Sequence, residues 1–142
     1  RSGGISSTMK DFGKGGWNVG KYNAKKAKRG NLTFDSQAEA RRYDELILLL
    51  RAGQIRNLQL QKTYCLQEPF TGLDGQRVLG VDYKADFDYE RKTAPDRYGN
   101  ICWLRVTEDV KGVRTESYSI KARMFHARYG YAITEISARR YR

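Results

Sequence analysis

The segment from Val81 to Tyr89 alternates strictly between apolar and charged side chains. A period of two residues is that of a β-strand, whose successive side chains point to opposite faces, and it does not fit an α-helix. We therefore predict a strand over 78–89 whose apolar face packs against another layer of the protein. The opposite face of this strand is polar and carries Asp82, Lys84, Asp86 and Asp88.

A helix is predicted to begin after Ser36 and to run to about Ala52. Ser36 is a favourable N-cap, Glu39 three positions later completes a capping box, and Gly53 provides a C-terminal stop. An apolar stripe at three- and four-residue spacing consists of Tyr43, Leu46, Ile47 and Leu50. Glu39 continues this stripe, where a carboxylate is costly unless a cation or a hydrogen-bond donor meets it.

The other predicted elements are three more strands and a second helix. The strands are expected over 58–66, 101–111 and 131–136, with turns over 71–76 and 92–100. The second helix, 116–129, ends at Gly130 and has one largely apolar face made of Tyr118, Ala122, Phe125 and Tyr129. This order of elements predicts a mixed α/β domain, in which a central sheet is flanked by helices.

The formal net charge of +11 is concentrated at the two ends of the chain. Residues 1–34 hold eight Lys or Arg against Asp11 alone, and residues 137–142 hold three arginines. We therefore expect a flexible basic arm over 1–33, a folded domain over 34–136 and a basic tail over 137–142. Residues 1–8 resemble an expression-tag remnant. Basic ends on a nearly neutral body favour a polyanion such as nucleic acid, and solvated tails without a partner are the alternative.

The candidate nucleic-acid-binding residues lie in the basic arm and on the second predicted helix. They are Lys25, Lys26, Lys28, Arg29, Lys121 and Arg123. For Lys121 and Arg123, the alternative is a solvated helix face without a partner. Trp17 and Tyr22 lie among the lysines of the arm, where they could stack on bases or dock on the domain. With no apolar run long enough to span a membrane and no secretory signal, we expect a cytoplasmic protein without membrane contact.

The scarcity of cysteine and histidine restricts the kind of metal site that the chain can build. Cys65 and Cys102 are too few for a structural zinc site, and His126 is the single histidine. Any bound metal must therefore be held by oxygen ligands, which favours Mg²⁺, with Mn²⁺ as a substitute.

The residues that could carry phosphodiester hydrolysis are Glu39, Asp86, Asp109 and Lys111. Asp109 and Lys111 are two positions apart in a predicted strand, so their side chains share a face. If the turn over 92–100 closes a hairpin, Asp86 on the preceding strand faces the same cleft, and Glu39 is supplied by the first helix. Converging carboxylates can hold a divalent cation, and a nearby lysine can orient water or offset developing negative charge.

This arrangement resembles that of the PD-(D/E)xK superfamily, the restriction-endonuclease-like nucleases. The segments 34–43, 52–55, 58–61, 83–87 and 108–112 further resemble small phage and prophage endonucleases of a Holliday junction resolvase-like family. The resemblance covers about residues 21–136. It implies a restriction-endonuclease-like fold and a Mg²⁺-dependent DNA endonuclease with Glu39, Asp86 and Asp109 as metal ligands and Lys111 as catalytic partner. It also implies a bacterial host that carries the phage or prophage.

Branched DNA is the expected substrate, and the two-fold symmetry of a four-way junction then favours a homodimer. A non-catalytic DNA-binding protein on the same fold, a nicking or single-strand nuclease and an RNA nuclease remain alternatives. The role of Glu108 also stays open, between metal binding through a bulge and pairing with a basic residue behind the sheet. Asp82 and Asp88 share the face of Asp86 and could assist it.

Overall fold

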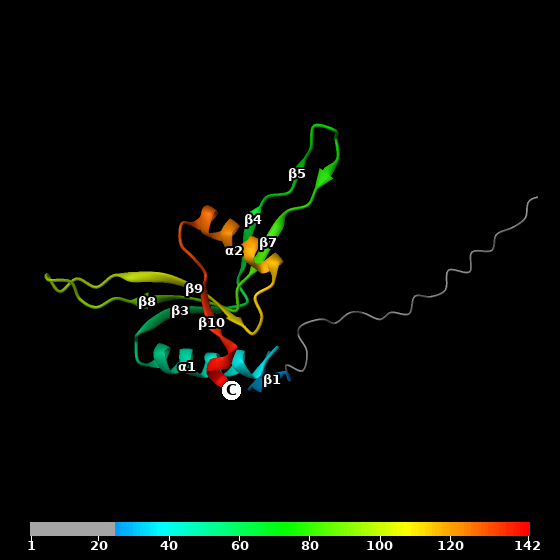
Figure 1. Cartoon of the computed structure of the whole chain (residues 1–142). Coiled ribbons are helices and arrows are strands. Elements are labelled where there is room, and N and C mark those ends of the chain that lie inside the picture. The colour runs from blue at the N-terminus through cyan, green and yellow to red at the C-terminus, as the bar shows by residue number, and fades with distance from the viewer. Residues whose placement is uncertain (1–24) are drawn as a thin grey trace, which may run out of the picture.

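The chain, described as a computed structural model over residues 25–142, is mixed α/β as predicted (Figure 1). Its elements are β1 (Ala27–Arg29), β2 (Leu32–Phe34), α1 (Gln37–Arg51), β3 (Ile55–Leu60), β4 (Thr63–Gln67), β5 (Phe70–Thr71), β6 (Arg77–Val78), β7 (Val81–Lys84), β8 (Phe87–Lys92), β9 (Trp103–Lys111), α2 (Glu116–Tyr129), β10 (Thr134–Ser137) and the 3₁₀ helix η1 (Ala138–Tyr141). No helix within residues 25–142 has the length and apolar character needed to cross a membrane.

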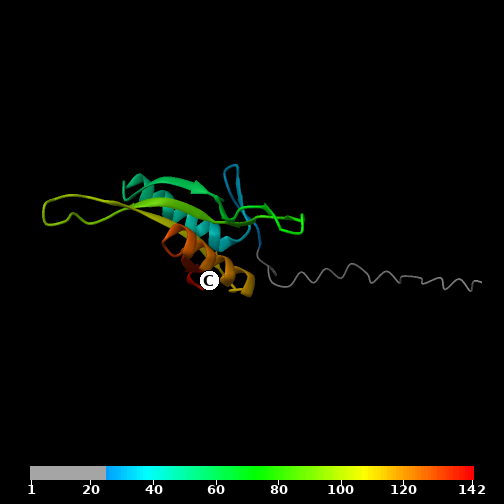
Figure 2. The same cartoon turned by 90° about the horizontal axis from the view of Figure 1, so that it is seen from above.

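The central sheet has four strands in the order β10-β9-β8-β3. β10 runs parallel to β9, while the β9–β8 and β8–β3 pairs are antiparallel. The predicted hairpin around 92–100 is confirmed, and it extends well beyond the body of the protein (Figure 1). A second hairpin, formed by β4–β7 and continued by β5–β6, projects away from the first when the molecule is seen from above (Figure 2).

Two of the predicted strands are each divided by a bend. The segment 58–66 is split between β3 and β4 at Gln61, whose φ of 55° lies in the left-handed region. The segment 78–89 contains β7 and β8, with Asp86 in the bend between them. The bends lie side by side, because Gln61 N–H donates to the Asp86 carbonyl at 3.1 Å and Ala85 N–H donates to the Lys62 carbonyl at 2.9 Å.

The predicted strand over 78–89 has one apolar face. Because of the bend at Asp86, the side chains of this face belong to two separate cores. Phe87 and Tyr89 join the core beneath α1, together with Leu46 and Ile55. The second core lies beneath α2 and contains Tyr64, Leu66, Tyr83, Ala85, Tyr118 and Phe125. A sequence pattern with period two predicts burial at these positions but not which layer covers each one.

Both helices have the ends expected from their capping residues. Ser36 Oγ accepts a hydrogen bond from Glu39 N at 3.1 Å, and Gly53 follows α1 with a φ of 72°. Thr115 caps α2, and Gly130 ends it in the left-handed conformation with a φ of 83°. The prediction was less accurate for the buried face of α1, since Leu50 remains 36% exposed. Ala38, Arg42 and Leu46, four positions apart, form the stripe that faces the sheet.

Both basic ends are more structured than expected where the structure describes them. The prediction of a flexible arm up to residue 33 is wrong for residues 27–33, which belong to the hairpin β1–β2 and place Ala27 in the core beneath α1. Residues 1–24, with Trp17 and Tyr22, lie outside the described residues. The predicted tail over 137–142 contains η1, which docks on α1 through Tyr141 Oη, a donor to Glu45 Oε2 at 3.0 Å.

Candidate functional site

Asp86 occupies the bend between β7 and β8, and backbone hydrogen bonds hold it there. Its N–H donates to the Glu108 carbonyl at 3.1 Å, and its Oδ2 accepts from Val110 N–H at 2.7 Å. Phe87 pairs with Glu108 in the β8–β9 ladder, so Asp86 continues that ladder beside Asp109. The predicted proximity of these two carboxylates on neighbouring strands is therefore confirmed.

Asp109 and Lys111 point to the same side of β9, as their spacing predicts. Lys111 Nζ lies 3.0 Å from Asp109 Oδ1, and the phenol of Tyr83 donates to Asp109 Oδ2 at 2.7 Å. The Asp109 side chain is 7% exposed, whereas that of Lys111 is 26% exposed. The lysine therefore links a buried carboxylate to the surface, where a phosphate could approach.

Two tyrosines that sequence reasoning assigned to apolar faces help to position this ion pair. Burial and the charge of Asp109 raise the pKa of the Tyr83 phenol, which keeps this group protonated as a hydrogen-bond donor. The ammonium of Lys111 lies 3.8 Å from the ring centroid of Tyr118. Tyr83 lies on β7 and Tyr118 on α2, so the pattern within either segment offered no signal that they meet at Asp109.

Glu39 lies at the start of α1, where its carboxylate contacts the N-cap residue and faces the acids of the sheet. Ser36 Oγ accepts from Glu39 N–H at 3.1 Å, as in a capping box, and also donates to Glu39 Oε1 at 3.3 Å. The negative charge of Glu39 also acts on Asp86, whose pKa it helps to raise. The expected approach of the first helix to the carboxylate pair is therefore observed, while the cap remains intact.

The electrostatics of the site concentrate on Asp86. Burial, followed by the charges of Asp109 and Glu39, raises the pKa of Asp86 to about 7, against an ordinary value of 3.8. The Val110 N–H and the Lys111 ammonium oppose this increase. Three acids thus share a partly buried space in which full ionisation is unfavourable without a compensating positive charge.

We expect the folded stability of the protein in EDTA to fall as the pH rises from about 4 to about 7. In this window folded Asp86 keeps a proton that the unfolded chain has released, so each step in pH favours unfolding. The effect should be on the order of a few kcal/mol. Urea unfolding at pH 5 and at pH 8 measures it.

Asp86→Asn is the matched variant for this pH dependence, since it cannot titrate. It should flatten the stability difference between pH 5 and pH 8. If Asp86 binds Mg²⁺, adding Mg²⁺ at pH 8 should raise the Tm of the unchanged protein more than that of Asp86→Asn. An unchanged pH profile in the variant would contradict the assignment of this titration to Asp86.

The donor set at this site fits a hard cation that keeps part of its water shell. Among residues 25–142, no three His, Cys, Asp or Glu side chains enclose a position for a metal ion. Mg²⁺ characteristically needs only one or two protein carboxylates and completes its octahedron with water and phosphate oxygens. Asp86 and Asp109 supply such carboxylates, and their mutual repulsion is what a divalent cation would relieve.

Comparison with known protein families matches residues 19–141 to the family described as "Protein of unknown function (DUF1064)". The chain belongs to this family. Comparison with curated proteins gives no match, and comparison with solved structures gives none either. The family description names no activity, so the chemistry of the site carries the functional argument.

In this DUF1064 chain, Glu108 takes the second of the two roles left open for it. It points to the face of β9 opposite Asp109, where Arg42 Nε and Nη2 donate to its two carboxylate oxygens at 2.9 and 2.5 Å. Tyr89 donates a further hydrogen bond to the same carboxylate. With the Glu108 side chain 1% exposed, this buried pair fastens α1 to the sheet.

Asp82 and Asp88, which were predicted to share a strand face with Asp86, differ in burial. Asp88 is 3% exposed and accepts hydrogen bonds from Tyr64 and from Thr107, whose Oγ1 lies at 2.7 Å. Arg105 Nη2 lies 3.3 Å from the same carboxylate. Asp88 is thus engaged in holding β4, β8 and β9 together, whereas Asp82 is exposed.

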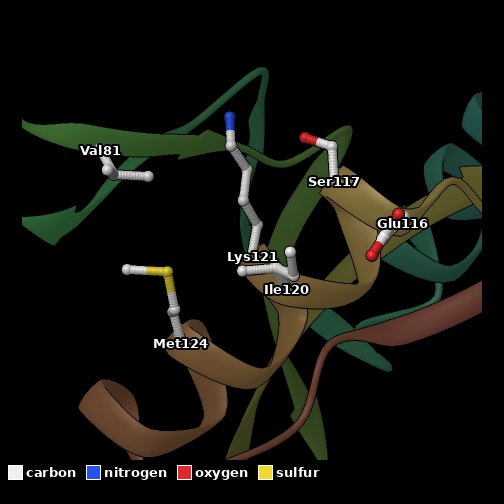
Figure 3. Close-up of a pocket in the computed structure, with 6 residues that line it drawn as sticks. All are labelled: Val81, Glu116, Ser117, Ile120, Lys121 and Met124. Atoms are coloured by element: carbon white, nitrogen blue, oxygen red, sulfur yellow. The ribbon is translucent and has the colours of Figure 1, made fainter.

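The predicted nucleic-acid-binding residues of the DUF1064 chain differ in their availability. Lys25, Lys26 and Lys28 are exposed, but Arg29 is held by Asp44, with donor–acceptor distances of 2.8 to 2.9 Å. Arg123 is exposed, and Lys121 lines an open hollow of about 390 Å³ between β7 and α2. Figure 3 shows the Lys121 ammonium and the Ser117 hydroxyl directed to the same side of this hollow.

Proposed function

We propose that this chain is a divalent-cation-dependent DNA endonuclease. The observation that carries the proposal is the convergence of Asp86 and Asp109 from adjacent strands, with Lys111 bound to Asp109 at 3.0 Å. A protein that merely bound DNA would gain nothing from carboxylates that converge just beneath the surface that meets phosphate. The restriction-endonuclease-like classification of the fold is part of the same proposal.

Within this proposal, Asp86 and Asp109 would hold the cation, with Glu39 as a third acid beside them. When bound, Mg²⁺ would activate water and neutralise charge at the scissile phosphate. Lys111, kept in place by Asp109 and the ring of Tyr118, orients the attacking water or offsets charge on a phosphate oxygen. Tyr83 keeps the Asp109 carboxylate in one orientation through its hydrogen bond.

Branched DNA is the substrate that we propose, in the cytoplasm of a phage-infected or prophage-carrying bacterium. Lys25, Lys26 and Lys28 are exposed, and we expect them to contribute contacts to phosphates, which act independently of base sequence. A four-way junction presents two equivalent strands, and paired cuts in them would require a homodimer with two sites.

The test is cleavage of labelled four-way junction, flap, duplex and single-stranded DNA in Mg²⁺ and in Mn²⁺. Asp109→Ala and Lys111→Ala are assayed beside the unchanged chain. Symmetric paired cuts in the junction, lost in both variants, would support the proposal in full. Cleavage of another substrate would support the nuclease activity and contradict the proposed preference for junctions.

Binding without any cleavage in either metal would contradict the enzyme proposal and leave a DNA-binding protein. DNA binding is therefore measured in EDTA with the same four substrates. Cleavage of RNA at an equal or higher rate, tested with RNA strands of the same sequence, would instead identify a ribonuclease.

A further inference from the structure

The hairpin formed by β8 and β9 extends beyond the part of the sheet that carries Asp86 and Asp109 (Figure 1). We call its distal part, residues 91–104, the arm; it is distinct from the basic N-terminal segment 1–33. Lys92 pairs with Trp103 at the last ladder position, and residues 93–102 form the tip. The arm has no role in the proposed chemistry, so its shape and its exposed side chains call for another explanation.

Hydrogen bonds give the tip of the arm a defined conformation. The Asp96 carboxylate accepts from Tyr98 N–H at 2.8 Å and from Asn100 N–H at 2.9 Å. Thr93 N–H donates to the Cys102 carbonyl at 2.8 Å, and Gly99 adopts a φ of 80° that a side chain would disfavour. The tip is therefore preorganised, which lowers the entropic cost of binding a partner through it.

The side chains presented at the tip are an aromatic ring and a guanidinium. Tyr98 is 73% exposed, so most of its ring is open to solvent. Arg97 lies over this ring, with its Cζ 4.8 Å from the ring centroid. Nearer the sheet, Arg56 lies 4.3 Å from the ring centroid of Trp103 in the same kind of contact. Paired aromatic and guanidinium groups provide flat surfaces for nucleobases and positive charge for phosphates.

The charges of the arm favour a polyanionic partner. Glu90, at its base, is occupied by Arg56 at 2.6 Å and Asn57 at 2.7 Å. The Asp96 carboxylate accepts hydrogen bonds from two backbone N–H groups of the tip and from the Asn100 side-chain amide. Among the ion pairs of the part of the chain that the structure describes, none includes Arg91, Lys92 or Arg97. The basic groups of the arm are thus available, whereas its acids are engaged.

We propose that the arm is a DNA-binding element in which Tyr98 stacks on an unpaired or terminal base at a branch point. This inference rests on the proposed function, because it names the feature of the DNA that the enzyme would recognise. Arg97 contacts a phosphate next to that base, and Arg91 and Lys92, nearer the sheet, contact phosphates further along the strand towards the bond to be cut. Six residues of extended strand separate Asp109 from Trp103, or about 20 Å at roughly 3.4 Å per residue. At about 3.4 Å per nucleotide, the recognised base lies six or more nucleotides from the bond to be cut.

The experiment compares the DNA affinity of the full chain with that of Tyr98→Ala, Tyr98→Phe and Leu73→Ala. Fluorescence anisotropy in EDTA measures binding to a four-way junction and to a continuous duplex of equal length. Tyr98→Ala should weaken junction binding about tenfold and duplex binding at most about twofold. Tyr98→Phe keeps the stacking ring and should bind like the unchanged chain. Leu73 is fully exposed on the hairpin β5–β6, so Leu73→Ala controls for loss of exposed apolar surface.

Equal losses on junction and duplex, no loss on either, or a loss in Tyr98→Phe equal to that in Tyr98→Ala would overturn the proposal. Conversion of a dimer into a monomer by Tyr98→Ala, seen by light scattering, would assign the arm to a protein interface instead. Because binding is measured without a cation, these outcomes do not depend on cleavage. If the chain cuts no DNA but shows the Tyr98-dependent preference for the junction, the proposal for the arm would stand and the proposal of nuclease activity would be wrong.

Discussion

Replacement of Asp109 by asparagine should lower the rate of DNA cleavage by on the order of 10³-fold or more. The amide keeps the shape of the side chain but removes the charge that holds Lys111 at 3.0 Å and would bind a divalent cation. Asp86→Asn should have an effect of similar size, since it removes the second carboxylate. Single-turnover cleavage of the preferred DNA substrate in Mg²⁺ gives both rates.

Two matched variants separate a catalytic effect from a general change of charge. Asp82→Asn makes the same substitution at an exposed position of β7, and it should cleave at the unchanged rate. Glu39→Gln leaves the Ser36 hydroxyl as acceptor for the N–H of residue 39, so helix stability should be retained while cleavage falls. If Asp109→Asn cleaves as fast as the unchanged chain, the site assigned here is wrong.

Removal of the Arg42 side chain should cost about 3–5 kcal/mol of folding free energy. Arg42→Ala leaves the Glu108 carboxylate buried beneath α1 without the guanidinium that donates to both of its oxygens. The residual donor, Tyr89, cannot compensate a full negative charge at a site that is 1% exposed. Urea unfolding, monitored by circular dichroism at pH 7, measures the loss.

Arg29→Ala provides the control for Arg42→Ala, because it also breaks an arginine–carboxylate pair that α1 makes. The Arg29–Asp44 pair is half-exposed, so its removal should cost at most about 1 kcal/mol. Simultaneous replacement of Arg42 and Glu108 by leucine should restore much of the stability lost in Arg42→Ala. A loss below about 1 kcal/mol in Arg42→Ala would show that Glu108 finds water or another partner when Arg42 is absent.

The parts of the fold that were predicted correctly depend on residues close together in sequence. Ser36 and Gly53 bracket α1, and Thr115 with Gly130 brackets α2, because caps act through backbone groups within one turn. The shared face of Asp109 and Lys111 followed from the period of a β-strand. The hairpin between β8 and β9 followed from a polar turn between two strand-like segments. Each of these inferences needed only local stereochemistry.

The predictions that were wrong or incomplete concern contacts between distant segments. The basic residues of 27–33 and of η1 looked solvated by composition, but Ala27 is buried and Tyr141 reaches Glu45 on α1. Burial in these segments depends on apolar or aromatic residues between the charges. A count of charge over a segment does not detect them.

The sequence by itself offered Glu39, Asp86, Asp109 and Lys111 as candidates, through helix position, strand period and the resemblance to a known nuclease superfamily that favoured Asp86 over Asp82 and Asp88. The tertiary structure decided what surrounds them. It brought Tyr83 and Tyr118 to the Asp109–Lys111 pair and set Glu108 against Arg42 on the opposite face of β9. It also placed the Asp86 bend between two cores, where burial and neighbouring charge raise the pKa of that carboxyl to about 7. Local pattern specifies the direction of a side chain, whereas its partners and its burial depend on segments that meet only when the chain is folded.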